Sequence, residues 1–120
     1  MANQAAYTGQ SAVSLYLSEP TPYLFPTSLN LGTESVGKTT APKKIILTNS
    51  GNAPLKLSSI TVTGDFLQTN NCGKRRAIGK SCTIEITFKP KAKGVRTGLM
   101  SIADNASVSP QKVHLKGTGD

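Results

Sequence analysis

Residues 82–90, CTIEITFKP, give the clearest indication of the fold of this chain. Its residues alternate strictly in character, with Cys82, Ile84, Ile86 and Phe88 on one face and Thr83, Glu85, Thr87 and Lys89 on the other. A period of two residues is typical of a β-strand that buries one face. Pro90 ends the run, because proline cannot donate a hydrogen bond to a neighbouring strand.

The same period recurs along the rest of the chain. Residues 43–49 place Ile45 and Leu47 on one face, and residues 55–63 keep the pattern with a shift of one at Ser58 and Ser59, where a β-bulge is expected. Further strands are expected at residues 29–31, 66–69, 94–102 and 112–116. No stretch keeps a helical period over three turns. The pattern predicts an all-β, immunoglobulin-like sandwich of about seven strands, with one closed sheet as the structural alternative.

Length and composition limit the class of protein. A chain of 120 residues can bury one core, and 37% hydrophobic residues are typical of a globular domain. Lysine and arginine number 14 against 6 acidic residues, which gives a net charge of +8 and a pI near 9.8. Such a surface attracts polyanions without specificity.

Residues 1–22 differ in character from the rest. Val13, Leu15 and Leu17 alternate with polar residues, and Pro20 and Pro22 indicate a stiff linker. We interpret residues 1–22 as an extension that either adds an edge strand, which we favour, or joins a preceding domain; residues 23–120 form the immunoglobulin-like domain. The N-terminus lacks the features of a secretion signal, and no apolar run is long enough to cross a membrane. The chain is therefore expected to be cytosolic, or a domain of a longer exported protein.

Two cysteines help to choose the compartment. Nine residues separate Cys72 from Cys82, and His114 lies far along the chain, so the usual four-ligand zinc site cannot be completed. A disulfide is favoured over two reduced thiols, and it would imply an oxidising compartment. Closing this loop would stabilise the fold by about 2 to 3 kcal/mol.

Four stretches carry a resemblance to a known family. They are PTSLNLGTESVG (26–37), ILTNSGNAPLKLSSITVTGDF (46–66), TNNCGKRRAIGKSCTIEITFKP (69–90) and GLMSIADNASVSPQKVHLKGTG (98–119). In order and spacing they resemble the choice-of-anchor D repeat, which belongs with the ASH (abnormal spindle, Hydin) branch of immunoglobulin-like domains, relatives of the major sperm protein and PapD-like folds. The resemblance covers residues 24–119.

The resemblance implies a role without catalysis. Bacterial members are tandem modules of exported or surface-attached proteins, often with a paired-cysteine loop, and eukaryotic relatives serve in targeting and scaffolding. We therefore expect no catalytic residue, metal or cofactor. The expected function is an interaction or spacer module of a secreted or cell-surface bacterial protein, with a protein or a neighbouring repeat as partner. Intracellular scaffolding is the alternative if the cysteines are reduced.

The loop between the cysteines departs from the family by its charge. It carries Lys74, Arg75, Arg76 and Lys80, and a second basic segment carries Lys89, Lys91, Lys93 and Arg96. If both lie at one end of the sandwich, they form a cationic tip that could bind an acidic polymer. The alternative is a solvated surface without a ligand. The aromatic content of 5% argues against nucleic acid and favours an acidic glycan.

Two features that suggest enzymes are better explained otherwise. Five residues separate Gly73 from Gly79 where a phosphate-binding P-loop has four, and a strand rather than a helix is expected to follow. His114 alternates with Lys112 and Lys116 on an outward face, without a catalytic motif beside it. An exposed histidine and a basic turn are the predictions here.

Overall fold

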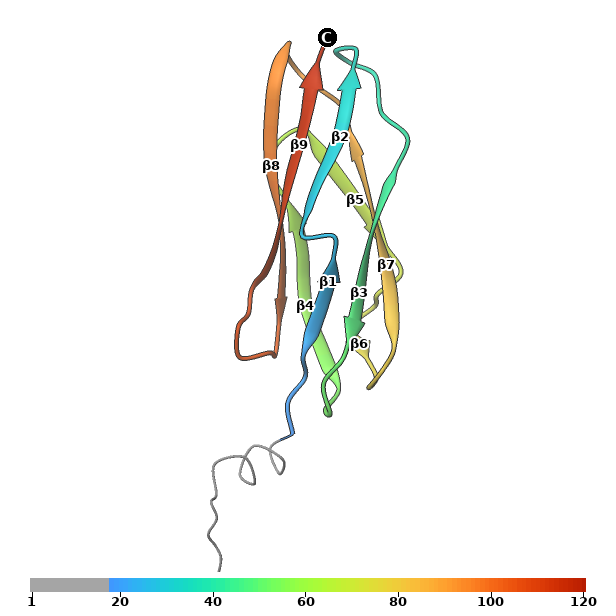
Figure 1. Cartoon of the computed structure of the whole chain (residues 1–120), viewed down its shortest axis with the longest axis vertical. Coiled ribbons are helices and arrows are strands. Elements are labelled where there is room, and N and C mark those ends of the chain that lie inside the picture. Colours follow the sequence, from blue (N-terminus) through green and yellow to red (C-terminus); the bar gives the residue numbers. More distant parts are fainter. Residues whose placement is uncertain (1–17) are drawn as a thin grey trace, which may run out of the picture.

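A computed structural model describes residues 18–120 as two β-sheets packed face to face (Figure 1). The first sheet has the strand order β1-β3-β7-β5, and the second has the order β2-β9-β8-β4-β6. The strands are β1 (Pro22–Phe25), β2 (Ser28–Glu34), β3 (Lys43–Asn49), β4 (Leu55–Val62), β5 (Phe66–Asn70), β6 (Arg75–Arg76), β7 (Ser81–Phe88), β8 (Gly94–Asp104) and β9 (Gln111–Gly119). The sandwich is confirmed. The strand expected at residues 13–17 lies outside the described residues.

The alternating residues form the core as predicted. Every apolar position of residues 82–88 is buried, and Phe88 stacks on Phe66 with their ring centroids 4.9 Å apart. The register between β4 and β8 shifts between Leu57 and Ser59, which confirms the bulge. Ile60 and Val62 beyond the bulge pack against the same core as the residues before it.

Two short strands were not predicted. β1 contains Pro22 and is followed by Pro26, and prolines argued against a strand there. It nevertheless pairs with β3, because an edge strand needs hydrogen bonds on one side only. β6 has two residues, too few for any period to show.

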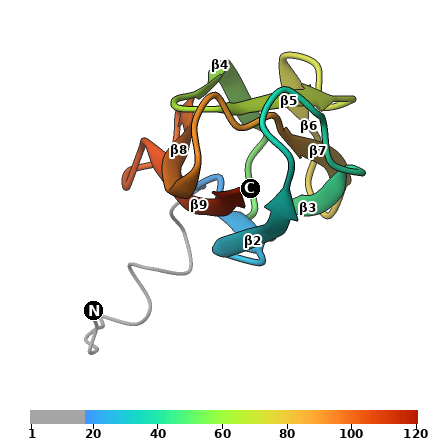
Figure 2. The ribbon, with the colours of Figure 1, turned by 90° about the horizontal axis from the view of Figure 1, so that it is seen from above.

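The chain changes sheets between β1 and β2. β1 pairs antiparallel with β3 in the first sheet, whereas β2 pairs parallel with β9 in the second. Viewed along the long axis, the sheets curve toward each other, with β5 beside β4 on one side and β2 beside β3 on the other (Figure 2). At the second side the Lys43 Nζ donates to the Asn30 carbonyl oxygen at 2.8 Å. Two separate sheets, rather than one closed sheet, enclose the core.

Candidate functional site

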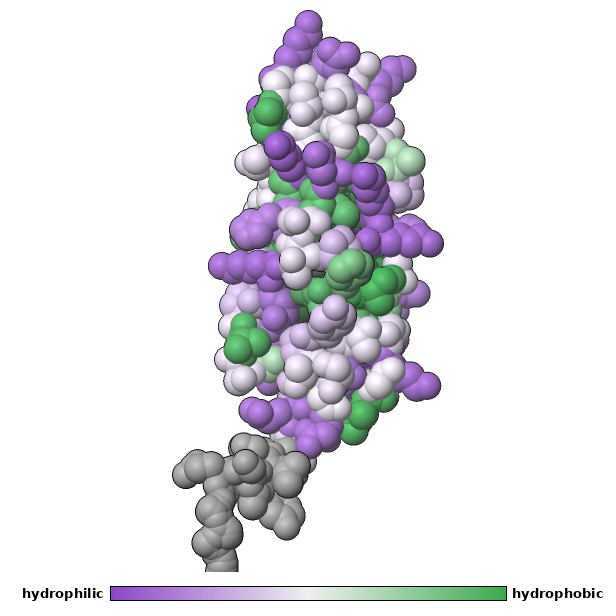
Figure 3. All heavy atoms as spheres, in the orientation of Figure 1, coloured by the Kyte–Doolittle hydropathy of each residue, from purple (hydrophilic) through white to green (hydrophobic). Residues whose placement is uncertain are grey.

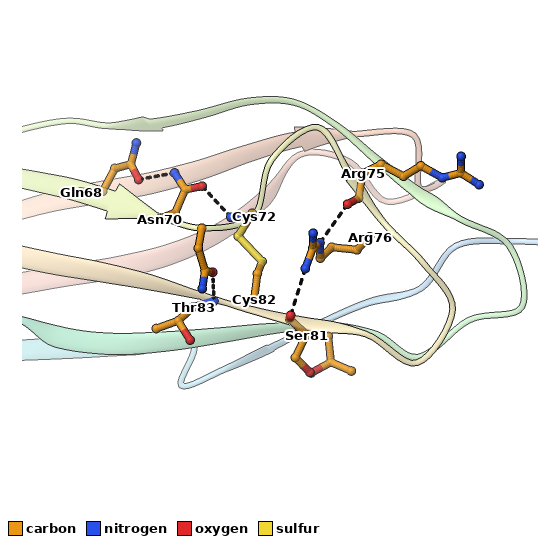
Figure 4. The surroundings of a disulfide bond; sticks show 10 residues. Gln68, Asn70, Cys72, Arg75, Arg76, Ser81, Cys82 and Thr83 are labelled. Atoms are coloured by element: carbon orange, nitrogen blue, oxygen red, sulfur yellow. Dashed lines mark hydrogen bonds between the residues drawn. A yellow bond between two sulfur atoms is a disulfide. The ribbon is translucent and has the colours of Figure 1, made fainter.

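A disulfide joins Cys72 to Cys82 and closes the basic loop (Figure 4). β5 and β7 pair antiparallel with Asn70 opposite Ile84, so Cys72 continues the register directly opposite Cys82. The two Cα atoms are 4.9 Å apart, as expected for opposite residues of neighbouring strands that exchange no backbone hydrogen bond. The bond therefore ties the end of β5 to the start of β7. The predicted pairing is confirmed.

The loop between the cysteines bridges the two sheets. β6, in its middle, pairs with β4 of the second sheet, with Arg76 opposite Leu55 and Arg75 opposite Lys56. The Leu57 N–H also donates to the Lys74 carbonyl oxygen at 2.9 Å. The loop leaves one sheet, binds the edge of the other and returns, so both of its ends and its middle are fixed.

Asn49 holds the loop from inside. Its side chain is fully buried at the end of β3, and Nδ2 donates to the carbonyl oxygens of Ala53 and Arg76 at 2.7 and 3.1 Å. Oδ1 accepts from the N–H groups of Thr21 and Gly51 at 3.3 and 3.1 Å. The sequence analysis did not predict this role of Asn49, although position 49 continues the buried face of Ile45 and Leu47. A buried amide needs hydrogen-bond partners, and this requirement is the signal in the sequence.

The N-terminal strap, residues 19–21, lies against the same end. The Asn52 N–H donates to the Glu19 carbonyl oxygen at 3.0 Å, and the Ser50 N–H donates to that of Thr21 at 2.8 Å. A Cβ on Gly51 would overlap the Glu19 carbonyl oxygen, so only glycine allows this close approach. Part of the expected linker is thus bound to the sandwich.

The basic side chains of the loop differ in their exposure and in their hydrogen bonds. Lys74, Arg75 and Lys80 are exposed. Arg76 is half-buried and its guanidinium folds back, with Nε donating to the Arg75 carbonyl oxygen at 2.8 Å and Nη1 to that of Ser81 at 3.2 Å (Figure 4). Lys56, opposite Arg75 on β4, adds an exposed cation that the sequence could not place, because the pairing partner has only two residues. The basic loop end therefore consists of Lys56, Lys74, Arg75 and Lys80.

The second basic segment lies at the other end of the sandwich. β7 starts at Ser81 beside the first loop and ends at Phe88 beside the second, roughly 20 to 25 Å away for a strand of this length. Lys91, Lys93 and Arg96 therefore do not join the loop, and the single cationic tip that required both segments at one end is not formed. Hydrophilic side chains lie along the whole length of the face shown in Figure 3, both ends included, and hydrophobic ones gather at mid-height over β1 and β3.

Arg96 is held by an acidic partner. Its Nε donates to Asp65 Oδ2 at 2.7 Å, and the Lys91 N–H donates to the same oxygen at 3.0 Å. The hydrogen bond from Arg96, followed by that from Lys91, lowers the pKa of the buried Asp65 carboxyl below its usual 3.8 despite the opposing effect of burial. The same hydrogen bond raises the pKa of Arg96. Asp65 fixes the turn between β7 and β8, and Arg96 pairs with it through Nε.

Other candidate chemistry is sparse in the part of the chain that the structure describes. No three side chains among its histidine, cysteine, aspartate and glutamate residues gather as metal ligands. His114 is exposed on β9, as predicted. Lys44 and Glu85 lie directly opposite each other on the outer face of the first sheet. Within residues 18–120, no helix has the length and hydropathy to cross a membrane.

Two sheets with these strand orders, with the chain changing sheets between β1 and β2, define an immunoglobulin-like domain of the PapD-like type. Residues 23–118 match the family described as HYDIN/CFA65/VesB-like immunoglobulin-like domain, and the chain belongs to this family. No curated protein sequence matches the chain.

Solved structures agree on the fold. A Porphyromonas gingivalis protein of unknown function is similar with a TM-score of 0.72 and 22% identity over 82% of this chain. The ASH/PapD-like domain 7 of human CEP192 is similar with a TM-score of 0.67 and 10% identity over 100% of this chain and 96% of its own. The secreted serine protease VesC of Vibrio cholerae is similar with a TM-score of 0.63 and 16% identity over 92% of this chain. The chain spans 46% of the P. gingivalis protein and 25% of VesC.

Proposed function

We propose that the chain is a non-catalytic interaction and spacing module of an exported or surface-attached bacterial protein with several domains. The path of the chain carries this proposal. The strap is bound at one end of the sandwich, whereas Asp120 exchanges backbone hydrogen bonds with Glu34 and Val36 at the opposite end (Figure 1). A module whose two ends are both fixed to its body sets the distance and the angle between its neighbours.

Two observations support export. A disulfide persists in oxidising compartments and is rare in the cytosol. VesC, whose structure contains a similar sandwich, is a secreted protease. This chain is similar to only part of VesC, so the likeness supports the role of an attached module rather than protease activity.

The use of the ionisable groups supports a role without catalysis. Asp65 and Arg96, whose pKa values are shifted, bind each other and the backbone of a turn. A catalytic group with a shifted pKa would instead face a nucleophile or a substrate hollow with partners to spare. Each of these groups has a structural explanation.

The spacing function is tested by the rigidity of the strap. In the full chain, we expect the backbone ¹⁵N relaxation of residues 19–21 to match that of the strands. Gly51→Ala should loosen the strap, because the new Cβ overlaps the Glu19 carbonyl oxygen. Ser50→Ala is the matched control, since it removes only the weak contact of Ser50 Oγ with the Thr21 carbonyl oxygen at 3.2 Å. A strap that already moves independently in the unmodified chain would refute a fixed joint.

Export is tested separately by thiol titration under denaturing conditions. We expect no free thiol in chain prepared from its native compartment. Two reactive thiols would instead favour an intracellular scaffolding role, like that implied for the eukaryotic relatives.

A second candidate function is binding of an acidic polymer at the basic loop end. It is favoured by the position of Lys56 opposite Arg75, which adds an exposed cation beside Lys74 and Lys80 on a loop fixed at three points. Heparin is a suitable probe. Binding should weaken steeply with salt, and Arg75→Ala should weaken it more than Lys93→Ala at the opposite end. Equal losses from the two variants would indicate net charge alone.

A further inference from the structure

The edges of the two sheets are not equally protected. Residues of an antiparallel strand alternately direct their backbone N–H and C=O groups toward and away from the neighbouring strand. Because the Ser50 N–H donates to the Thr21 carbonyl oxygen, residue 21 faces β3, and residues 22, 24 and 26 direct their backbone groups away from β3. Two of these three residues are Pro22 and Pro26, which have no N–H. β1 therefore offers a new strand a single donor, from Leu24.

Two other edges are blocked in different ways. β2 has an irregular register between Asn30 and Thr33, and Lys43 Nζ occupies the Asn30 carbonyl oxygen. β6 consists of Arg75 and Arg76 alone. Short edges, bulges and lysines are the usual means by which proteins prevent unwanted strand pairing.

β5 has none of these protections. It runs through Phe-Leu-Gln-Thr-Asn, without charge or proline. Hydrogen bonds from the Lys89 N–H to Asp65 and from the Asn71 N–H to Thr83 flank its pairing with β7. By antiparallel alternation, the backbone groups of Phe66, Gln68 and Asn70 point away from β7.

These outward groups have no partner in the described chain. Within residues 18–120, β5 has β7 as its one strand neighbour, and no hydrogen bond from another segment reaches the N–H or C=O groups of Phe66, Gln68 and Asn70. The nearby edge of β4 is less available, because the Gln68 amide donates to the Ile60 carbonyl oxygen at 3.4 Å. Gln68 is half-buried and Asn70 is exposed, so their two donors and two acceptors form the open part of this row. Phe66, with 3% of its surface exposed, is the covered start of the row.

One hollow borders this row on the side away from β7. It has a volume of about 160 Å³ and lies between Gln68 and Asn70 of β5 and residues 57–60 of β4. Two larger hollows, of about 400 and 390 Å³, adjoin β5 but lie over the outer face toward β7, because residues 89–91 line the first and Thr83 and Glu85 line the second. Side chains of an added strand alternate between its two faces, so those on the inner face can enter the hollow beside β4.

Charge selects the kind of strand that fits. Lys89 and Lys91 line the hollow at the start of β5, and Lys74 lines the hollow near its end. Of the acidic groups that line these hollows, Asp65 is paired with Arg96, and Glu85 lies opposite Lys44. Lysines at both ends of the row favour acidic residues on both sides of an incoming segment.

We propose that β5 accepts an extended peptide segment with acidic flanks, which pairs with Gln68 and Asn70 as an additional strand of the first sheet. This inference rests on the interaction part of the proposed function and gives it a location. A second copy of the chain is a poorer occupant, because each copy carries a net charge of +8.

The test uses the full chain and a synthetic probe, acetyl-Asp-Glu-Val-Thr-Val-Thr-Val-Glu-Asp-amide. The probe should shift the amide resonances of Gln68 and Asn70 and slow the hydrogen exchange of these amides, with little effect on β1. Alternate N-methylation on the bonding side of the probe should abolish binding, and methylation on the other side should not. Replacing its acidic residues by Asn and Gln should weaken binding about tenfold at low salt.

A matched pair of variants separates backbone pairing from side-chain contact. Gln68→Pro removes an outward N–H without touching the bonds to β7, and should weaken probe binding at least about tenfold. Gln68→Ala keeps the N–H and loses the same side-chain amide, and should stay within about threefold of the unmodified chain. Equal binding by Gln68→Pro, or no shift at these amides at millimolar probe, would refute the proposal.

Two further outcomes would also overturn it. In the free chain, strong protection of the Gln68 and Asn70 amides would mean that the edge is already occupied by the chain itself. A dimer in sedimentation that Gln68→Pro dissociates would make a second copy the occupant. The strap measurement stands apart: a rigid strap with no probe binding would leave the spacing role in place and remove only the added strand.

Discussion

The two ends of the sandwich carry similar positive charge but are stabilised in different ways. At the basic loop end, a disulfide and the buried amide of Asn49 fix the loop, and neither depends on charge. At the other end, the turn between β7 and β8 depends on the ionised carboxylate of Asp65 and its bonds to Arg96 and Lys91. The first end should therefore respond to redox conditions, and the second to pH.

This difference shows that local charge does not reveal what a basic loop does. Arg76 and Arg96 both looked available for anions in the sequence, yet each is engaged within the fold. At the basic loop end, the exposed cations lie on backbone that covalent and amide contacts hold in place. Such a loop can present charge without the entropy cost of ordering it on binding.

The largest expected effect is loss of the disulfide. The double variant Cys72→Ser/Cys82→Ser should lose about 3 kcal/mol of unfolding free energy, because the unfolded chain is no longer restrained. Chemical denaturation measures this loss, and reduction of the unmodified chain should reproduce it. Hydrogen exchange should rise in residues 73–80 and stay unchanged in the turn at residues 89–93. An unchanged midpoint would show that the bond contributes nothing to the loop end.

Removal of the Asn49 amide should have the next largest effect. Asn49→Ala leaves two carbonyl oxygens and two N–H groups without their partner, which should cost about 2 kcal/mol even if water enters. The strap and the basic loop should loosen together, as seen by ¹⁵N relaxation. Asn30→Ala is the control, since that exposed side chain accepts a single local hydrogen bond from Gly32. Loosening of the loop alone would disprove the shared support.

At the opposite end, stability should depend on the ionisation of Asp65. Because its partners lower its pKa in the folded state, the stabilisation is complete above the unfolded value, near 3.8, and is lost as pH falls through the lower folded value. Asp65→Asn should lower the unfolding free energy by about 1 to 2 kcal/mol at pH 7. The difference from the unmodified chain should shrink below pH 4. The disulfide variant should show no such convergence, and a constant gap for Asp65→Asn would contradict the assignment.

The sequence could predict the inner faces of the central strands because their alternating apolar residues are buried, as in residues 82–88. It could not predict that other apolar strand residues, such as Leu67 and Val95, are exposed. The bulge at Ser58 and Ser59 could be predicted from the same alternation of apolar and polar residues. The shift of that alternation by one residue is visible because apolar residues lie both before and after it.

The sequence could not predict β1, because a proline's effect depends on which side of the strand faces a partner. The structural role of Asn49 was not predicted, because position 49 was interpreted only as part of an alternating strand. A polar side chain on the buried face of that strand needs hydrogen-bond partners.

The separation of the two basic segments could have been predicted. Residues 82–88 form one strand between them, and the two ends of a strand lie at opposite ends of a sheet. Only the pairing of β6 with β4 could not be predicted, because a strand of two residues is too short to show an alternating pattern. Lys56, which this pairing brings beside Arg75, is therefore the part of the candidate site that only the structure reveals.

The smallest expected effect concerns the repulsion between the positive charges of Lys56 and Arg75. Lys56 lies directly opposite Arg75, an arrangement that destabilises a sheet when the charges are unscreened. Either Lys56→Gln or Arg75→Gln should raise the unfolding free energy by about 0.3 kcal/mol at low salt, and the double variant should gain less than the sum. The coupling should vanish in high salt, as screening removes the repulsion. Lys93→Gln at the other end tests whether net charge alone is responsible: a gain equal to that of Lys56→Gln would remove the case for a locally crowded loop. If the coupling is present, the fold tolerates repulsion at this end because the disulfide and Asn49 hold the loop against it, and a bound acidic polymer would relieve it.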